Sequence, residues 1–319
     1  MYTDIKTGFT CNNSCIHCVI APIRDSLLDE QKPLNSLTEE VKQFINDAID
    51  RGSDTIVLTG GEVTIRKDFH ELLEYANSKK LKIVVQTNGR TFSKPAQLET
   101  LKNIPNIVVV IAIHGPNDKV HDRITRKKGS FNQTVNAIDT LNHLRNVKIC
   151  AKIVISNHNA ESISETVNFL CKKCIKRIAI AFPHAEDFPE AVFKEVVPRY
   201  KSLPNEINRI LKLADENSLQ VTFETIPYCI MPDSPGFWKR SLDASFAIFG
   251  GENPGFMQRT GESHVHEWEK ERKEIKQKGK KCRLCVFDKV CEGAWREYIH
   301  YFGNEEFIPI SDLSVVDKL

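Results

Sequence analysis

The feature that most constrains the fold is an alternation of short β-branched runs with amphipathic helical patterns. Six apolar runs have the length of buried strands, and a helical pattern follows each of them. This alternation is typical of βα units around a parallel sheet, so the sequence predicts an α/β fold, a partial (β/α)6 TIM-like barrel. The strands are expected at residues 4–10, 55–59, 82–87, 107–114, 148–156 and 177–182. The first helix is expected to begin at Thr38, which would be its N-cap. Further helices are expected at residues 68–79, 95–102, 130–144 and 162–174, and within 206–217.

The pattern changes beyond about residue 182. Prolines interrupt two further helical patterns, and residues 219–225 predict one more strand. Residues 232–261 combine Pro, Gly and Ser with aromatic side chains, which we expect to pack against the protein, and residues 267–281 predict a charged helix. We therefore expect the barrel at 1–185, connecting helices and a strand at 186–225, and a small irregular C-terminal domain at 226–319.

The ten cysteines need an explanation other than disulfides. A chain of 319 residues buries roughly 75% of the surface of its unfolded form, so its core needs no covalent support. The opening residues contain Asp4 and Lys6 without an apolar stretch, and the longest apolar run, 107–113, fits a buried strand, so we expect a cytoplasmic protein without a membrane partner. In a reducing cytosol, clustered cysteines indicate metal binding or redox chemistry. The net charge of +2 gives no electrostatic case for nucleic acid.

Three of the cysteines, Cys11, Cys15 and Cys18, stand within eight positions directly behind the first expected strand. A disulfide clip, a zinc knuckle, a redox pair or an incompletely ligated metal cluster would each use such a group. Zinc takes four ligands in a closed structural site, and His17, flanked by two of the cysteines, is poorly placed to be the fourth. The spacing suits three thiolates that bind three irons of a cubane and leave the fourth iron open.

Polar or glycine residues follow three of the expected strands at the end where βα barrels bind their ligands. Two consecutive glycines let backbone approach a ligand closely, and a neighbouring carboxylate accepts hydrogen bonds from an amine. The residues concerned are Gly60, Gly61, Glu62, Asn88, Gly89 and His114.

Taken in chain order, Cys11-x3-Cys15-x2-Cys18, Gly60-Gly61-Glu62 and Thr87-Asn88-Gly89 resemble the radical S-adenosylmethionine (SAM) superfamily over roughly the first 185 residues. The resemblance implies a 4Fe–4S cluster on the three cysteines, with SAM on the open iron and its amine held by Gly60, Gly61 and Glu62. It also implies an electron donor such as flavodoxin or ferredoxin, and a 5′-deoxyadenosyl radical that abstracts hydrogen from the substrate. The cofactor would supply the chemistry, and the protein its geometry.

The same resemblance suggests further contacts with SAM. His17 stands where the family usually has an aromatic residue near adenine. Asn88 and His114 are expected to meet the ribose or methionyl portion, although each could equally be a strand-end cap. The candidates for the SAM carboxylate are Lys152 and either Arg123 or Arg126, with surface solvation as the alternative for each.

A second set of cysteines lies beyond the barrel: Cys229, Cys282, Cys285 and Cys291. Four thiolates could hold a structural zinc ion or one fully ligated 4Fe–4S cluster. The spacing C-x2-C-x5-C resembles the SPASM and twitch domains that carry auxiliary clusters in the radical SAM superfamily, which implies one auxiliary 4Fe–4S cluster. The remaining cysteines, Cys150, Cys171 and Cys174, are expected to be packing residues.

The leading hypothesis is therefore a radical SAM enzyme that acts on a peptide or a small-molecule metabolite. The alternatives are a zinc-stabilised binding or scaffold protein without redox chemistry, and a simple electron-transfer protein, which would leave Gly60-Gly61-Glu62 without a role. The candidate pocket residues downstream are Tyr228, Trp238, His264 and His266.

Overall fold

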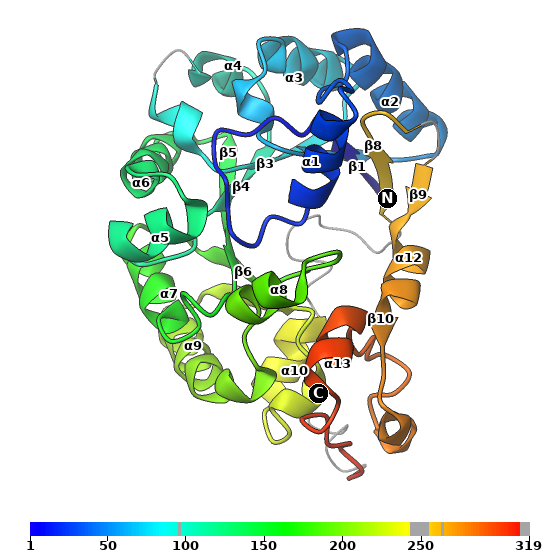
Figure 1. Cartoon of the computed structure of the whole chain (residues 1–319). Coiled ribbons are helices and arrows are strands. Elements are labelled where there is room, and N and C mark those ends of the chain that lie inside the picture. The colour runs from blue at the N-terminus through cyan, green and yellow to red at the C-terminus, as the bar shows by residue number, and fades with distance from the viewer. Residues whose placement is uncertain (95–96, 243–254, 263–264, 313–319) are drawn as a thin grey trace.

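The computed structural model describes residues 1–94, 97–242, 255–262 and 265–312 of the chain. Within these residues, a nine-stranded sheet organises the molecule (Figure 1). The strands lie in the order β7-β6-β5-β4-β3-β2-β1-β8-β9. All neighbours are parallel except β8 and β9, so the predicted α/β barrel-like fold is confirmed. The bounds are β1 (Tyr2–Lys6), β2 (Thr55–Thr59), β3 (Lys82–Thr87), β4 (Ile107–Ala112), β5 (Val147–Val154), β6 (Arg177–Ala181), β7 (Gln220–Glu224), β8 (Phe256–Arg259) and β9 (Val265–Glu267).

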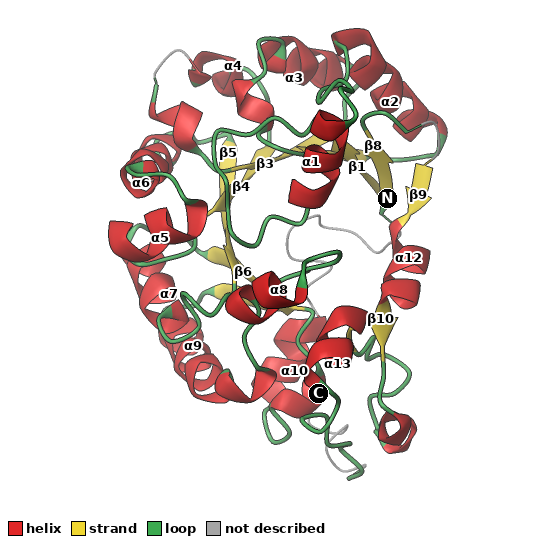
Figure 2. Ribbon diagram, viewed as in Figure 1, coloured by secondary structure: helices red, strands yellow, loops and turns green. Residues whose placement is uncertain are grey.

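Helices cover the outer side of this curved sheet (Figure 2). They connect successive parallel strands, as crossover helices do in α/β proteins. The outer helices are α2 (Thr38–Asp50), α3 (Phe69–Ser78), α4 (Glu99–Lys102), α5 (Asp118–Thr125), α6 (Ser130–Leu141), α7 (Ile163–Lys172) and α9 (Pro204–Glu216). The others are α1 (Ala21–Asp29), α8 (Glu190–Val196), α10 (Pro235–Leu242), α12 (Trp268–Ile275) and α13 (Arg296–Phe302).

The sheet separates two apolar cores. The larger one lies between strands and outer helices, and the smaller one fills the inner side of the sheet with one residue from each of five strands: Val57, Val84, Val110, Cys150 and Ala179. Alternate residues of a strand point to opposite faces, so strands buried on both faces are apolar throughout. Residues two positions farther along each of these strands point to the same inner side of the sheet.

The C-terminal segment returns to the first strand. Residues Phe256–Arg259 of β8 pair in parallel with Thr3–Lys6 of β1. Farther along, β10 (Lys276–Gln277) pairs antiparallel with β11 (Ala294–Trp295), and this short ribbon closes a loop that contains Cys282, Cys285 and Cys291.

Several expected boundaries were wrong. The first strand ends at Lys6 instead of residue 10, because residues 7–10 leave the ladder while still bonding to the end of β2. The charged helix stops at Ile275, because the next two residues pair with β11. Helix α2 is capped by Leu37 instead of Thr38: Glu40 accepts a hydrogen bond from the Leu37 N–H at 2.7 Å, and the Thr38 hydroxyl donates to Asp68 at 2.8 Å.

The remaining expectations for packing have mixed outcomes. Cys150 is buried and Cys171 partly buried, but Cys174 is exposed just beyond α7, with a positive φ of 60°. Part of the aromatic loop is helix α10, in which Phe237 and Trp238 are buried, and residues 256–259 form β8; residues 243–254 lie outside the described residues. Among the helices described, none combines the length and apolarity that a membrane crossing requires.

Candidate functional site

The first three cysteines lie in the loop between β1 and α1, which we call the cysteine loop (residues 11–18). All three are free and partly buried. Burial raises the pKa of the Cys11 thiol to about 11 and that of Cys15 to about 12, so both are protonated at neutral pH in the absence of a metal. Metal binding at this loop would therefore release protons.

Two residues from the end of β3 hold the cysteine loop. The Asn88 side-chain amide donates to Asn12 Oδ1 at 2.6 Å, and Arg90 Nη1 donates to the Asn12 carbonyl at 2.5 Å and to Asn13 Oδ1 at 2.8 Å. The other polar groups of Asn88 also bond to protein, including the contact from the Arg90 N–H to Asn88 Oδ1 at 3.1 Å. These bonds are those of a strand-end cap, while a contact between Asn88 and SAM stays a prediction.

The glycines Gly60 and Gly61 allow two backbone segments to touch. The Gly61 N–H donates to the Gly8 carbonyl at 2.8 Å, and the Glu62 N–H donates to the Thr10 carbonyl at 2.9 Å. A Cβ on Gly60 would lie 2.2 Å from the Gly8 oxygen, and one on Gly61 would lie 2.2 Å from the Thr10 oxygen. The glycines therefore position the start of the cysteine loop against the end of β2; whether they also approach the SAM amine stays a prediction.

Glu62 joins the ends of β2 and β3. Its buried carboxylate accepts hydrogen bonds from the Thr64 hydroxyl at 2.5 Å, from the Thr87 hydroxyl at 2.6 Å and from the Asn88 N–H at 2.6 Å. Burial raises the pKa of the Glu62 carboxyl, while these bonds act in the opposite direction. Oε2 takes part in one of these bonds, which leaves acceptor capacity for an amine.

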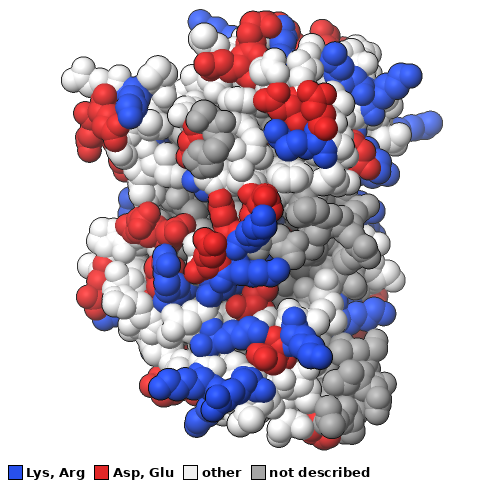
Figure 3. Space-filling model, turned by 90° about the vertical axis from the view of Figure 1, so that its right-hand side faces the viewer, with Lys and Arg blue, Asp and Glu red and all other residues white. Residues whose placement is uncertain are grey.

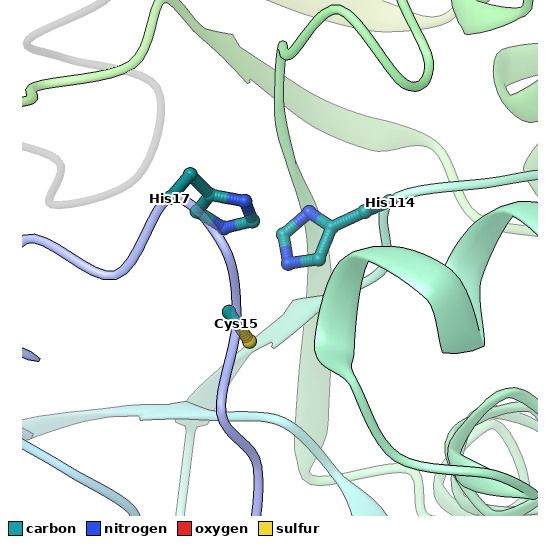
Figure 4. A group of neighbouring side chains, drawn as sticks. All are labelled: Cys15, His17 and His114. Carbon is teal, nitrogen blue, oxygen red and sulfur yellow. The ribbon is translucent and has the colours of Figure 1, made fainter. Parts of the chain in front are cut away.

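Cys15, His17 and His114 form a close group, in which the sulfur and one nitrogen of each ring lie within 4.8 Å of one another (Figure 4). The two rings meet edge to face, with centroids 4.5 Å apart. The His17 ring thus lies beside the Cys15 thiol, although its position between two cysteines was expected to place it poorly for sharing a ligand with them. Its Nδ1 is buried and has no hydrogen-bond partner among the described residues, which makes it available to a ligand.

Both rings of that group are neutral at pH 7. Burial lowers the pKa of His17 to about 4 and that of His114 well below its usual value. His114 Nδ1 accepts a hydrogen bond from the Val154 N–H at 3.2 Å, and His121 Nδ1 accepts one from the His114 N–H at 3.1 Å. Strand β5 and helix α5 thereby position His114 beside the cysteine loop.

The charged candidates for the SAM carboxylate lie in different surroundings. Lys152 on β5 pairs with Glu224 on β7 at 2.7 Å, across the small side chains of Ala179 and Ala181 on the intervening strand. Arg123 is exposed on α5. A contact between either residue and SAM stays a prediction.

The structure brings the second set of cysteines together. Cys229, Cys282, Cys285 and Cys291 line one cavity, although Cys229 precedes the others by more than 50 residues in the sequence. Burial raises the pKa of Cys229 to about 12, with a further contribution from the other three thiols. Four convergent, free thiols suit either a 4Fe–4S cluster or a zinc ion.

The predicted downstream pocket residues divide into packing residues and one histidine that contacts two carboxylates. Tyr228 lines the cysteine cavity and stacks on Phe287, with the ring centroids 4.7 Å apart. Trp238 is buried in the core, and its indole N–H donates to the Tyr228 carbonyl at 3.2 Å. His266 contacts the carboxylates of Glu262 and Glu271. His264 lies outside the described residues.

Sequence reasoning missed two residues of this region. Arg90 follows the predicted Thr87-Asn88-Gly89 segment directly, so its place after a strand end was a usable signal. Glu224 is the acidic residue that follows the three buried residues of β7, and a charge in that position was also a signal.

Comparison with known proteins gives one family and several relatives. The family model described as "Radical SAM superfamily" matches residues 5–170. Fe-coproporphyrin III synthase of Methanosarcina barkeri is 29% identical over 53% of this chain and 40% of that protein. The subtilosin biosynthesis protein AlbA of Bacillus subtilis is 35% identical over 44% of this chain and 30% of that protein. The chain thus matches less than half the length of these relatives.

Solved structures share the fold at low identity. Streptococcus suis SuiB bound to S-adenosylmethionine superposes with a TM-score of 0.66 and 15% identity, over 97% of this chain and 76% of that one. The structure titled "Native anSMEcpe with bound AdoMet" gives a TM-score of 0.63 and 12% identity, over 99% of this chain and 95% of that one. Both likenesses extend through the C-terminal segment.

Proposed function

This chain belongs to the radical SAM superfamily, and from that membership we propose that it modifies a peptide through a 5′-deoxyadenosyl radical. Enzymes of this superfamily use SAM and a 4Fe–4S cluster, and this chain is an enzyme of that kind. When bound, the cluster and SAM supply one-electron cleavage chemistry that no amino-acid side chain provides.

The residues of the cysteine loop fit such a cluster. Cys11, Cys15 and Cys18 supply three thiols within one loop that Asn88 and Arg90 hold in place. The partnerless Nδ1 of His17 and the remaining acceptor capacity of Glu62 suit the base and the amine of SAM. In this proposal the chain's own residues bind and orient SAM, and the barrel limits access of water.

A peptide is the substrate class that the relatives favour. AlbA is named for the biosynthesis of a bacteriocin, and the Bacillus subtilis protein SkfB, 30% identical over 49% of this chain and 36% of that protein, is named for maturation of a sporulation killing factor. SuiB has also been solved bound to the precursor peptide SuiA. These names support, for this chain, a modification of a ribosomally made peptide.

We assign the second cysteine set to one auxiliary 4Fe–4S cluster. The support is the convergence of its four thiols on one cavity and the C-x2-C-x5-C spacing of three of them. A zinc ion at the same place is the alternative, and it would make the C-terminal segment a scaffold without redox chemistry.

Anaerobic reconstitution followed by metal analysis tests both assignments. We expect about eight iron atoms per wild-type chain and about four after replacement of either cysteine set by alanine. Only the variant without Cys11, Cys15 and Cys18 should fail to make 5′-deoxyadenosine from SAM under dithionite. Wild-type protein that binds zinc but no iron would contradict the proposal.

A tetrapyrrole is the second candidate substrate, because Fe-coproporphyrin III synthase and a haem synthase of Methanosarcina barkeri are among the relatives. The reconstituted enzyme can be offered iron coproporphyrin III and, separately, a synthetic peptide encoded beside its gene. Mass spectrometry that finds a modified peptide and unchanged porphyrin supports the first candidate, and the reverse supports the second.

A further inference from the structure

Three consecutive basic residues, Arg126, Lys127 and Lys128, form an exposed turn at the end of α5, which we call the basic turn. None of the three forms an ion pair with another described residue. Arg123, one helical turn earlier, is also exposed and also forms no ion pair with another described residue. In a chain with a net charge of only +2, these four cations outnumber the neighbouring Asp122 carboxylate and make a distinct local field.

The basic turn is rigidly built. The Asp122 carboxylate accepts hydrogen bonds from the Gly129 N–H at 2.5 Å, the Ser130 hydroxyl at 2.8 Å and the Phe131 N–H at 2.8 Å. Arg126 ends the helix in the left-handed region, with φ of 52°. The three cations are therefore presented on a fixed support, which lowers the entropy cost of binding a partner there.

The same turn is bonded to the cysteine loop. The Ser14 N–H donates to the Thr125 carbonyl at 3.0 Å, and the Ile16 N–H donates to the Ile124 carbonyl at 3.0 Å, one bond on each side of Cys15. In Figure 1 the blue loop that precedes α1 crosses to the side of the molecule where α5 lies. Ser14 is exposed, so the cysteine loop reaches the surface directly beside the basic turn.

We propose that the basic turn is the docking site of an acidic one-electron carrier that reduces the cluster on Cys11, Cys15 and Cys18. In the encounter, the reduced carrier loses one electron and the cluster gains it, and no covalent bond is made or broken. Charge complementarity steers such transient redox encounters, whose interfaces are small. The inference rests on the proposed function, because it assumes a cluster in the cysteine loop.

A second basic segment provides the competing site and the control. Lys280 and Lys281 are adjacent, exposed and without an ion pair among the described residues, and they precede Cys282 of the second set. Figure 3 shows the face that carries this part of the chain, with lysine and arginine side chains gathered in its lower half. A carrier that docked there would deliver its electron beside the second cysteine set instead.

Binding of an acidic flavodoxin to the reconstituted enzyme tests the proposal. We compare Lys127→Glu/Lys128→Glu with Lys280→Glu/Lys281→Glu by calorimetry at low salt, and we follow 5′-deoxyadenosine formed from SAM with either reduced flavodoxin or dithionite. We expect the first variant to bind flavodoxin at least about tenfold more weakly and to lose flavodoxin-driven SAM cleavage in proportion, while dithionite-driven cleavage is unchanged. The second variant should match wild type in all three measurements.

Each other outcome overturns the inference. If Lys127→Glu/Lys128→Glu binds flavodoxin as wild type does, the basic turn is not the docking site. If both variants lose the same affinity, the attraction is unspecific. If only Lys280→Glu/Lys281→Glu loses affinity, the docking site lies in the C-terminal segment. A polyglutamate peptide that competes as strongly as flavodoxin would assign the turn to acidic peptides. Absence of dithionite-driven cleavage in wild type would instead contradict the proposed function, so the two failures are distinguishable.

Discussion

At Gly61 even a methyl side chain should disturb the cysteine loop. Its missing Cβ would lie 2.2 Å from the Thr10 carbonyl oxygen, a backbone atom that cannot move without the cysteine loop. We expect Gly61→Ala to cost about 1–3 kcal/mol of unfolding free energy and to reduce the iron held by the first cysteine set. Urea unfolding and metal analysis of the reconstituted protein measure both effects.

Gly236 provides the matched control, because its nearest neighbour would be a flexible arginine side chain 3.6 Å away. Gly236→Ala should leave both measurements close to wild type. Full iron occupancy in Gly61→Ala would show that the cysteine loop does not depend on this backbone contact.

His121 gives the protein a pH dependence with a definite sign. Burial lowers the pKa of His121 to about 4, from about 6.5 in an unfolded chain. Between these two pH values the unfolded chain binds more protons at this residue than the folded chain does. The contribution of His121 to stability is therefore fully present above pH 6.5 and is lost as the pH falls toward 4. From pH 7 to pH 5 this residue alone should cost about 2 kcal/mol.

Urea unfolding of wild type and His121→Asn at both pH values isolates that contribution, because the asparagine oxygen can still accept from the His114 N–H. We expect the wild type to lose about 2 kcal/mol more than the variant. The exposed His143, replaced in the same way, should not alter the pH response. Parallel losses in wild type and His121→Asn would contradict the prediction.

At the scale of elements, the β10–β11 ribbon determines whether the second cysteine set can converge. Gly293 precedes β11 with φ of 85°, and a Cβ there would lie 2.3 Å from the Gln277 carbonyl of β10. We expect Gly293→Ala to separate the two strands and to lower metal occupancy of the second set by at least about half, with the first set unaffected. Metal analysis in a background without the first three cysteines reports on the second set alone.

Gly129 separates backbone strain from the steric clash. It has a similar φ of 81°, but its Cβ would meet nothing within 4 Å. Gly129→Ala should therefore cost stability without loss of metal from the second set. Equal metal occupancy in Gly293→Ala and wild type would show that the ribbon does not control this site.

At the scale of the whole molecule, β8 makes the barrel depend on the C-terminal segment. Without residues 226–319, the β1 edge would lose its partner and expose unpaired backbone groups, which promotes aggregation. We expect the fragment 1–225 to elute as aggregates or to be recovered only from inclusion bodies, whereas the full chain stays dispersed. Size-exclusion chromatography and circular dichroism test this, and a monomeric, cooperatively unfolding fragment would contradict it.

The sequence predicted the layers of the molecule better than its contacts. Strands β2 and β3 begin and end at the residues expected, because polar, charged or glycine residues flank their apolar runs. Hydrophobic periodicity shows which face of a helix or strand is buried, but not which distant residues that face contacts. It therefore did not predict the Lys152–Glu224 ion pair or the hydrogen bond from Arg90 to the cysteine loop. Residues 7–10 have the composition of a strand although they lie outside the ladder, because extended backbone favours the same residues whether or not it is paired.

The pairing of β1 with β8 also has a consequence for biosynthesis. A ribosome makes β1 before the cysteine loop and makes β8 some 250 residues later, so one side of β1 stays open until most of the chain has emerged. During that interval Cys11, Cys15 and Cys18 are already part of the emerged chain, because they precede β8 in the sequence. Synthesis of the first cysteine set and completion of the sheet are thereby separated in time.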